Sequence, residues 1–210
     1  MDSALLRATY AITEADLPSM VLYRNQLPPE LRSFHDLREG PLDNRAMAEH
    51  SLPGNTEEKV RATGRITGYL KEFMNPAAAE ATERPSQGMD LVAATVVHLF
   101  ENEASVSTWM RETFVRQFEE QVGELISPGQ QVLQVDRLEI PRFADEAVAL
   151  RVLQGNPVGI LSSTVLDLRV GRLLGVAYVA SAGTVERADL VVPMARELER
   201  QMVRVALGSR

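Results

Sequence analysis

The chain contains no cysteine, which excludes disulfide bonds, zinc sites built from thiolates and cysteine nucleophiles. Several recurring catalytic patterns are missing as well. The sequence has no phosphate-binding G-x-x-x-x-G-K-[ST] loop, no G-x-S-x-G nucleophile turn, no H-E-x-x-H zinc pair and no calcium-binding loop. The motifs therefore predict no catalytic residue, no metal and no cofactor.

No hydrophobic run approaches the roughly 20 residues that a membrane-spanning helix needs. The first ten residues, MDSALLRATY, also lack the basic and apolar regions of a secretion signal. The chain is therefore expected either to be cytoplasmic or to have lost an export signal. Its net charge of −7 argues against a nucleic-acid partner, because phosphate binding requires a concentrated positive surface.

The first 62 residues contain few apolar clusters and many turn-forming residues. Proline and glycine interrupt any long element, at Pro18, Pro28–Pro29, Gly40–Pro41 and Pro53–Gly54. Short helices are expected at residues 4–9 and 45–50. Because such a segment cannot bury a core of its own, we interpret residues 1–62 as an extended arm that wraps the rest of a single domain, residues 1–210.

Apolar residues alternate or run continuously in six later segments, which predicts strands. These segments span residues 63–73, 89–100, 130–140, 145–154, 159–170 and 172–183. The second is apolar on both faces, as expected for a strand in the middle of a covered sheet. A short turn around Gly171 joins the last two as a hairpin. Since the last four strands leave no room for helices between them, the sheet is expected to be mostly antiparallel.

Two segments show the periodicity of a long amphipathic helix. Residues 105–126 place six apolar side chains on one face: Val106, Met110, Phe114, Phe118, Val122 and Leu125. Residues 189–207 repeat the pattern, provided that Pro193 lies in the first turn. The predicted fold class is therefore α+β, with two long helices packed on a mostly antiparallel sheet as an α-β-α sandwich.

Histidine and tryptophan supply the first candidate site residues. His98, near the end of a predicted strand, is a candidate general base, although a histidine at a strand end is more often structural. His35 and His50 lie near carboxylates but lack the tight spacing of a metal site. Trp109 is the single tryptophan, one residue off the apolar stripe of its helix, where it either packs at the edge or floors a ligand pocket.

The hairpin segment SSTVLDLRVGRLLGVAYVA, residues 162–180, carries the remaining candidates. Asp167 and Arg169 share one face of their strand with Ser163, so they are able to pair with each other or to bind a polar ligand. Tyr178 lies on the next strand. Since no adjacent base is available to activate a serine, we interpret this face as a polar outer strip of the sheet. The ligand-binding candidates are His98, Trp109, Asp167, Arg169 and Tyr178.

Four short phrases, EADLPSM, GRITGY, RFADEAVAL and LLGVAYVA, resemble a group of bacterial secreted or lipoprotein-type domains. A more distant resemblance extends to extracytoplasmic sensor domains of mycobacterial serine/threonine kinases and to PsbP-type α-β-α sandwiches. The kinase sensor domains carry disulfides, which this chain lacks. The resemblance spans about residues 15–207. It implies an exported, membrane-anchored protein that binds a small molecule or a partner, and it implies no catalytic residues.

Three functional hypotheses follow. The leading one is a non-enzymatic, extracytoplasmic, sensor-like domain that binds a ligand or a protein partner, and it predicts a concave apolar pocket rimmed by polar groups. The second is a hydrolase that uses His98 with a nearby carboxylate. The third is a scaffold that forms homodimers through an edge strand or the terminal helix, and it predicts an exposed apolar patch.

Overall fold

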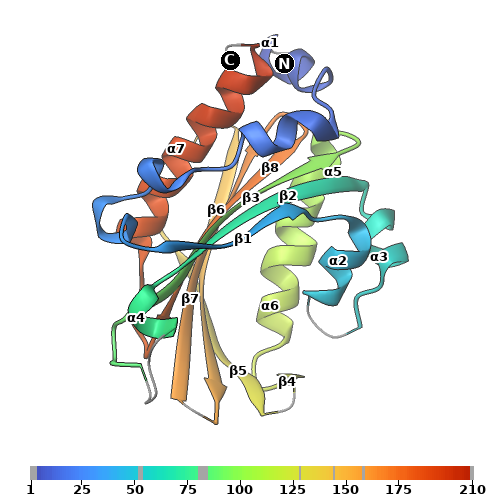
Figure 1. Ribbon diagram of the computed structural model, residues 1–210. Coiled ribbons are helices and arrows are strands. Elements are labelled where there is room, and N and C mark those ends of the chain that lie inside the picture. The colour runs from blue at the N-terminus through green and yellow to red at the C-terminus, as the bar shows by residue number, and fades with distance from the viewer. Residues whose placement is uncertain are drawn as a thin grey trace.

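The computed structural model describes residues 4–208, apart from residues 52–53, 80–84, 128, 144 and 158. Its centre is an eight-stranded sheet with the order β1-β2-β3-β8-β7-β6-β5-β4, in which neighbouring strands pair antiparallel (Figure 1). The strands are β1 (His35–Pro41), β2 (Arg65–Met74), β3 (Asp90–Phe100), β4 (Leu125–Ser127), β5 (Gln130–Leu138), β6 (Glu146–Asn156), β7 (Gly159–Val170) and β8 (Leu173–Ala182). This confirms the prediction of an α+β fold with a mostly antiparallel sheet.

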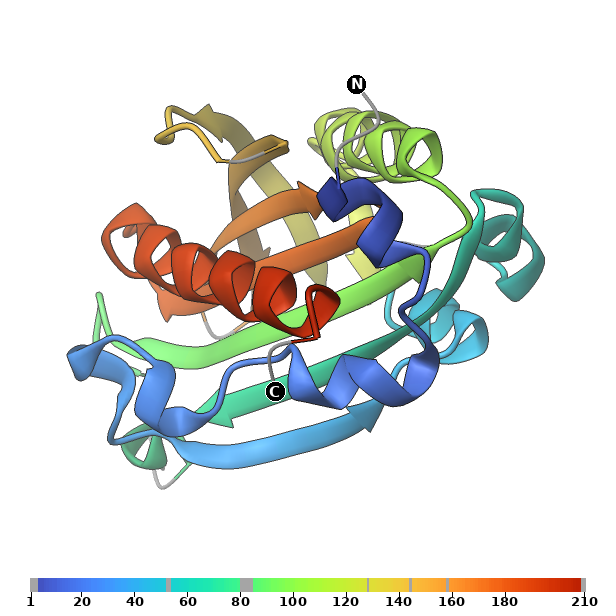
Figure 2. The same cartoon turned by 90° about the horizontal axis from the view of Figure 1, so that it is seen from above.

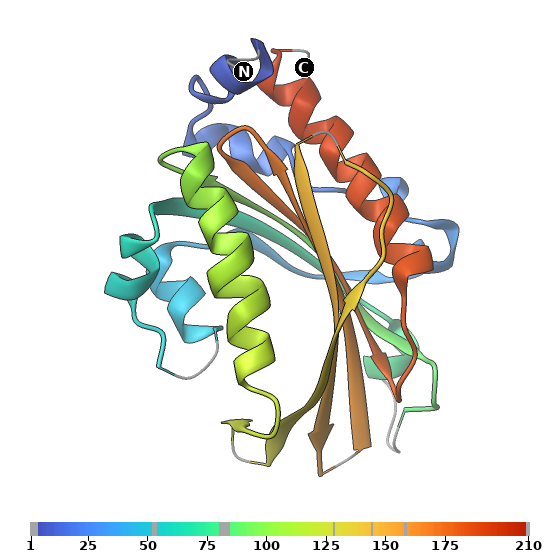
Figure 3. The ribbon, with the colours of Figure 1, turned by 180° about the vertical axis from the view of Figure 1, so that it is seen from behind.

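Helices lie on both faces of this sheet (Figures 2 and 3). One face carries α7 (Ala188–Ala206) and the N-terminal segment with α1 (Ala4–Thr9), η1 (Glu14–Ser19), η2 (Arg24–Gln26) and η3 (Pro29–Leu31). The other face carries α2 (Asn44–Glu49), α3 (Glu57–Ala62) and a continuous helical segment of α5 (Glu103–Thr108), η4 (Trp109–Arg116) and α6 (Gln117–Glu120). The short α4 (Pro76–Ala79) follows β2. None of the described helices is long and apolar enough to cross a membrane.

The main hydrophobic core lies between α7 and the sheet. Met194, Leu198 and Met202 on one side of α7 are fully buried. Gly175 in β8 allows the helix to come this close. A Cβ atom at position 175 would lie 2.7 Å from Met202 Sδ and 3.1 Å from Leu198 Cδ2, so a larger residue would require these side chains to shift.

The N-terminal segment packs into the same core. Leu22 is fully buried, and its backbone N–H donates to the Thr95 hydroxyl at 3.1 Å. Arg172 lies in the β7–β8 turn, and its guanidinium donates to the backbone carbonyls of Thr9 at 3.1 Å and Ile12 at 2.9 Å. Apolar burial and side-chain hydrogen bonds therefore both attach this segment to the sheet.

The structure corrects the helix predicted over residues 105–126. Helical structure begins at Glu103 and ends at Glu120, and its middle part, η4, is a π-helix. Val122 and Leu125, which were expected on the buried stripe, are 47% and 65% exposed. Gly123 has a φ of +89°, a left-handed backbone conformation that glycine adopts without strain and that does not continue a helix.

Other elements also differ from the sequence-based expectation. β1 lies within the first 62 residues, where only short helices were expected, and it pairs with β2. The short β4 pairs with β5. Pro193 lies in the second turn of α7, not in the first as the periodicity required. The hairpin of β7 and β8 around Gly171 forms as predicted, with Val170 opposite Leu173.

Candidate functional site

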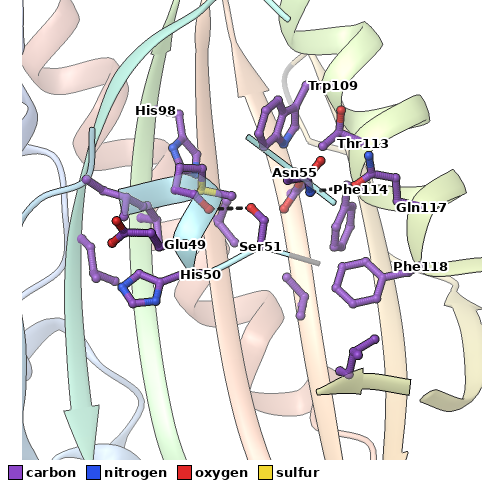
Figure 4. Close-up of a pocket in the computed structure, with 18 of the residues that line it drawn as sticks. Glu49, His50, Ser51, Asn55, His98, Trp109, Thr113, Phe114, Gln117 and Phe118 are labelled. Carbon is purple, nitrogen blue, oxygen red and sulfur yellow. Dashed lines mark hydrogen bonds between the residues drawn. The ribbon is translucent and has the colours of Figure 1, made fainter. Parts of the chain in front are cut away.

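A groove of about 640 Å³ lies between the sheet and the helical segment α5–η4–α6 (Figure 4). Side chains of β2, β3, β7 and β8 form its floor, namely Leu70, Val96, His98, Val165, Asp167 and Val176. One wall consists of Trp109, Thr113, Phe114, Gln117 and Phe118 from η4 and α6. The opposite wall consists of α2 and the residues after it, including Met47, Glu49, His50, Ser51 and Asn55. The volume lies within the range of about 300–1,000 Å³ that is typical of small-molecule sites.

Asp167 lies in the floor of this groove and is 2% exposed. Its neighbours across the strands are Val148 on β6 and Val176 on β8. Within the part of the chain that the structure describes, no group donates a hydrogen bond to this carboxyl and no cation pairs with it. Burial raises the pKa of Asp167 well above its usual value, because the apolar surroundings favour the neutral form. Its oxygens are not fully enclosed, because among the described residues the fully buried side-chain polar atom without a hydrogen-bond partner is Ser162 Oγ. The Asp167 carboxyl is therefore open to the groove, which makes it the strongest ligand-binding candidate there.

The interpretation of the Asp167 strand face as a polar outer strip is therefore wrong for this residue. The helical segment α5–η4–α6 covers that face of the sheet. Arg169 does not pair with Asp167. Its guanidinium lies 3.6 Å from Asp145 Oδ2 and 3.4 Å from Glu146 Oε2, and it does not line the groove.

His98 lies in the same floor, on β3, but its chemistry differs from that of a general base. Its Nδ1 accepts hydrogen bonds from Arg65 at 3.0 Å (Nε) and 2.9 Å (Nη2), so Nε2 carries the proton of the neutral ring. Burial lowers the pKa of His98 well below its usual value, and the Arg65 charge lowers it further. Among the described residues, no carboxylate lies within hydrogen-bonding distance of His98. The hydrolase hypothesis required such a carboxylate, and the structure does not support it.

Arg65 lies behind His98 and forms hydrogen bonds that hold this end of the groove together. It is 1% exposed, and burial lowers the pKa of its guanidinium to about 10. Besides His98, it donates to Asn44 Oδ1 at 2.7 Å and to the Leu42 carbonyl at 2.6 Å. Asn44 is the first residue of α2, so Arg65 connects the groove floor to the wall that α2 forms. Arg65 was not among the predicted site residues, because nothing in its strand pattern distinguishes a buried arginine from an exposed one.

Trp109 both packs and lines the groove. It is 4% exposed, its ring meets Phe100 edge to face with centroids 5.6 Å apart, and it lies 6.2 Å from the His98 ring. Figure 4 shows Trp109, Phe114 and Phe118 following one another along this wall. Trp109 and Phe114 belong to the π-helical turn, a rare distortion that often occurs at functional sites. Phe114 and Phe118 were predicted only as core residues of the helix stripe, and the groove uses them as well.

Tyr178 lies on β8 beside the groove but does not line it. It packs with Leu42, Leu70 and Ala94, and burial raises the pKa of its phenol. A hydrogen bond with the Ser163 hydroxyl partly offsets this rise in the pKa of Tyr178. The structure thus brings His98, Trp109 and Asp167 together in one groove and leaves Arg169 and Tyr178 outside it.

The charged residues at the groove rim are paired with one another. The Arg38 guanidinium donates to Glu72 Oε2 at 2.9 Å and to His50 Nε2 at 3.0 Å. Glu49 pairs with Arg45 at 3.2 Å on the exposed side of α2. Among the described residues that line the groove, the arginine, Arg38, is therefore already paired. Within the described part of the chain, no three histidine, aspartate or glutamate side chains are placed to hold a metal ion.

No protein-family model matches this sequence, and no curated protein does. The fold is similar to a solved structure, the extracellular domain of PknH from Mycobacterium tuberculosis, with a TM-score of 0.56. The match covers 94% of this chain and 97% of that domain, at 8% sequence identity. This likeness concerns the fold. In fold alone, it agrees with the distant resemblance to extracytoplasmic kinase sensor domains that the sequence suggested.

Proposed function

We propose that this protein is a non-enzymatic, extracytoplasmic, sensor-like domain that binds a small molecule in the groove between the sheet and η4–α6. The observation that carries the proposal is the buried carboxyl of Asp167, which has no partner among the described residues and lies in the floor of the groove. Because native proteins rarely leave a buried polar group unpaired, a ligand that pairs with Asp167 accounts for its retention.

The shape and chemistry of the groove support binding over catalysis. Its walls combine aromatic rings with amides such as Gln117, Gln130 and Gln154, the mixture that positions a small molecule through apolar contact and a few polar groups. Arg65 donates to Nδ1 of His98, the histidine in the floor. The ring therefore offers a ligand the N–H of Nε2, which is a hydrogen-bond donor and not a base.

The extracytoplasmic part of the proposal is supported by the likeness of the fold to an extracellular domain over nearly the whole chain. The finer description as an α-β-α sandwich, with an arm formed by residues 1–62, belongs to the same proposal. Binding of a protein partner and homodimerisation stay predictions. The mass spectrum of the natively purified protein, described next, also tests them.

Native mass spectrometry of the protein purified from its own cells tests the proposal, with a denatured sample as the control. The expected result is a small molecule that survives gentle ionisation and is lost on denaturation. Titration of the apo protein with the extracted compound is then followed by fluorescence. Trp109 is the single tryptophan of the chain and lies in the groove wall, so its emission reports occupancy directly.

Two neighbouring substitutions separate groove binding from binding elsewhere. Thr113→Phe places a ring in the groove lining, whereas Glu112→Phe places the same ring on the exposed side of the helix, where Glu112 pairs with Arg116. We expect Thr113→Phe to abolish the bound mass and Glu112→Phe to retain it. A bare protein whose tryptophan emission responds to no extracted compound, or equal binding by both variants, contradicts the proposal.

A further inference from the structure

The chemistry of the groove floor selects among classes of ligand. Asp167 is flanked by Val148 and Val176 on the adjacent strands, so the protein itself supplies no donor at this point. Because the apolar surroundings favour the neutral form of Asp167, its ionised form is stabilised best by a ligand that brings both a positive charge and hydrogen-bond donors. A protonated amine has both properties, because its ammonium nitrogen carries the charge and up to three N–H donors.

The other charges of the groove do not oppose this sign of ligand. Its lining contains three carboxylates, Glu49, Glu72 and Asp167, against the single guanidinium of Arg38. Arg38 is held by Glu72 at 2.9 Å and by His50. Because Glu72 pairs with Arg38 and Glu49 with Arg45, the rim charges offset one another, and the carboxyl of Asp167 decides which charge the groove favours. A cation is able to pair with this carboxyl, whereas an anion is not favoured beside it.

The aromatic wall accommodates the rest of such a molecule. Trp109, Phe114 and Phe118 present three rings on one side of the groove, and Val165 and Val176 lie in the floor. Aromatic faces attract cations and bury hydrocarbon chains equally well. The groove thus combines an apolar channel with an anionic terminus.

Resting on the proposed function, we propose that the ligand is an amphipathic cation whose protonated amine pairs with Asp167 and whose hydrocarbon part lies along Trp109, Phe114 and Phe118. The head group specifies the class of ligand, and the apolar wall supplies the contact area. The alternatives are a neutral ligand, such as a sugar, and an anionic ligand, such as a lipid. The alcohol and the carboxylate in the test below represent these two classes.

Three probes that share one skeleton test the inference: 4-phenylbutylamine, 4-phenylbutan-1-ol and 4-phenylbutyrate, titrated by calorimetry at one ionic strength. We expect the wild-type protein to bind the amine at least about 10-fold more tightly than the alcohol, the ratio typical of one hydrogen bond to a charged group. We expect the carboxylate to bind more weakly than the alcohol. These comparisons use the wild-type chain and do not depend on the folding of any variant.

The variant Asp167→Asn then assigns the preference to one residue. It should lose the preference for the amine over the alcohol. The matched control, Asp189→Asn, removes the same charge from the exposed first turn of α7 on the opposite face of the sheet, and it should keep the preference.

The outcomes distinguish this inference from the proposed function. Equal binding of amine and alcohol, or tightest binding of the carboxylate, overturns the inference and leaves the groove as a binding site. An amine preference that persists in Asp167→Asn overturns it as well. If none of the probes binds at millimolar concentration, the cation inference is wrong, while the native mass spectrum decides separately whether the groove holds another ligand.

Discussion

The Arg65 guanidinium is the most heavily bonded buried charge beside the groove. Its replacement by methionine tests how much these hydrogen bonds contribute to the stability of the protein. Methionine has a similar length and no donors. In Arg65→Met, three acceptors lose their donor: His98 Nδ1, Asn44 Oδ1 and the Leu42 carbonyl. All three belong to residues that are at most 8% exposed, so water does not readily replace the lost bonds.

The expected loss of stability is the difference of two terms. Leaving three buried acceptors unsatisfied costs about 1–3 kcal/mol each, or about 6 kcal/mol in total. Against this, the variant no longer buries a guanidinium whose pKa burial lowers from its ordinary value to about 10, a burial cost of about 3 kcal/mol. The net destabilisation is about 3 kcal/mol. For a chain of this length, that corresponds to a fall in Tm of about 6–12 °C.

Thermal unfolding followed by circular dichroism measures this change. The matched control is Arg45→Met on the exposed surface of α2, whose pair with Glu49 is worth about 0.5 kcal/mol or less. We expect the control to unfold within about 2 °C of the wild type. A Tm of Arg65→Met equal to or above that of the wild type would refute the reasoning, because the lost hydrogen bonds would then be worth less than the burial of the charge.

Three further outcomes are expected. Asp167→Asn should stabilise the free protein near neutral pH. Because the folded pKa of Asp167 is raised, its stabilising contribution is complete below about 3.8 and is lost as the pH rises through the folded value. Each unit by which folding raises the pKa of Asp167 corresponds to about 1.4 kcal/mol. The Tm difference between the variant and the wild type should therefore grow from pH 4 to pH 8. A constant difference would contradict a raised pKa of Asp167. Leu198→Ala should lower the free energy of unfolding by about 2–5 kcal/mol, measured in urea, whereas Arg200→Ala on the exposed side of α7 should change it little. Arg172→Met removes donors to the carbonyls of Thr9 and Ile12, and limited proteolysis should then cleave the N-terminal segment faster than in the wild type; equal rates would show that apolar burial alone holds it.

Some elements of the fold could be predicted because their side chains follow one period. The strands β2, β3 and β5–β8 alternate or run apolar over most of their length, and the turn at Gly171 is too short for anything but a hairpin. β1 could not be predicted in this way. Its residues, HDLREGP, are almost all exposed, so their pattern carries no signal of burial, and the strand is formed by backbone pairing with β2.

The helix over residues 103–120 shows how far a period can mislead. The apolar spacing continues through Val122 to Leu125, but Gly123 turns the backbone into a left-handed conformation and the chain enters β4. Periodicity indicates which side chains share a face of the helix. The end of the helix depends instead on a single residue whose backbone conformation is not helical.

The candidate site was partly named and partly misread from the sequence. His98, Trp109 and Asp167 were all named, and the structure brings them into one groove. Asp167 was nevertheless interpreted as part of an exposed strip with Arg169. Alternation along β7 shows which residues share a face with Asp167, but whether that face is covered depends on a helix about sixty residues earlier in the chain.

The sequence by itself determined the elements and their apolar faces, because propensity and periodicity are local properties of neighbouring residues. It also determined what these 210 residues lack: cysteine and the short catalytic motifs. Only the tertiary structure decided which polar residues became buried and which partners they met. It is the packing of η4–α6 and α2 against the sheet that leaves Arg65 fully bonded and Asp167 unpaired, since the desolvation of a charged group depends on contacts between segments far apart in the chain.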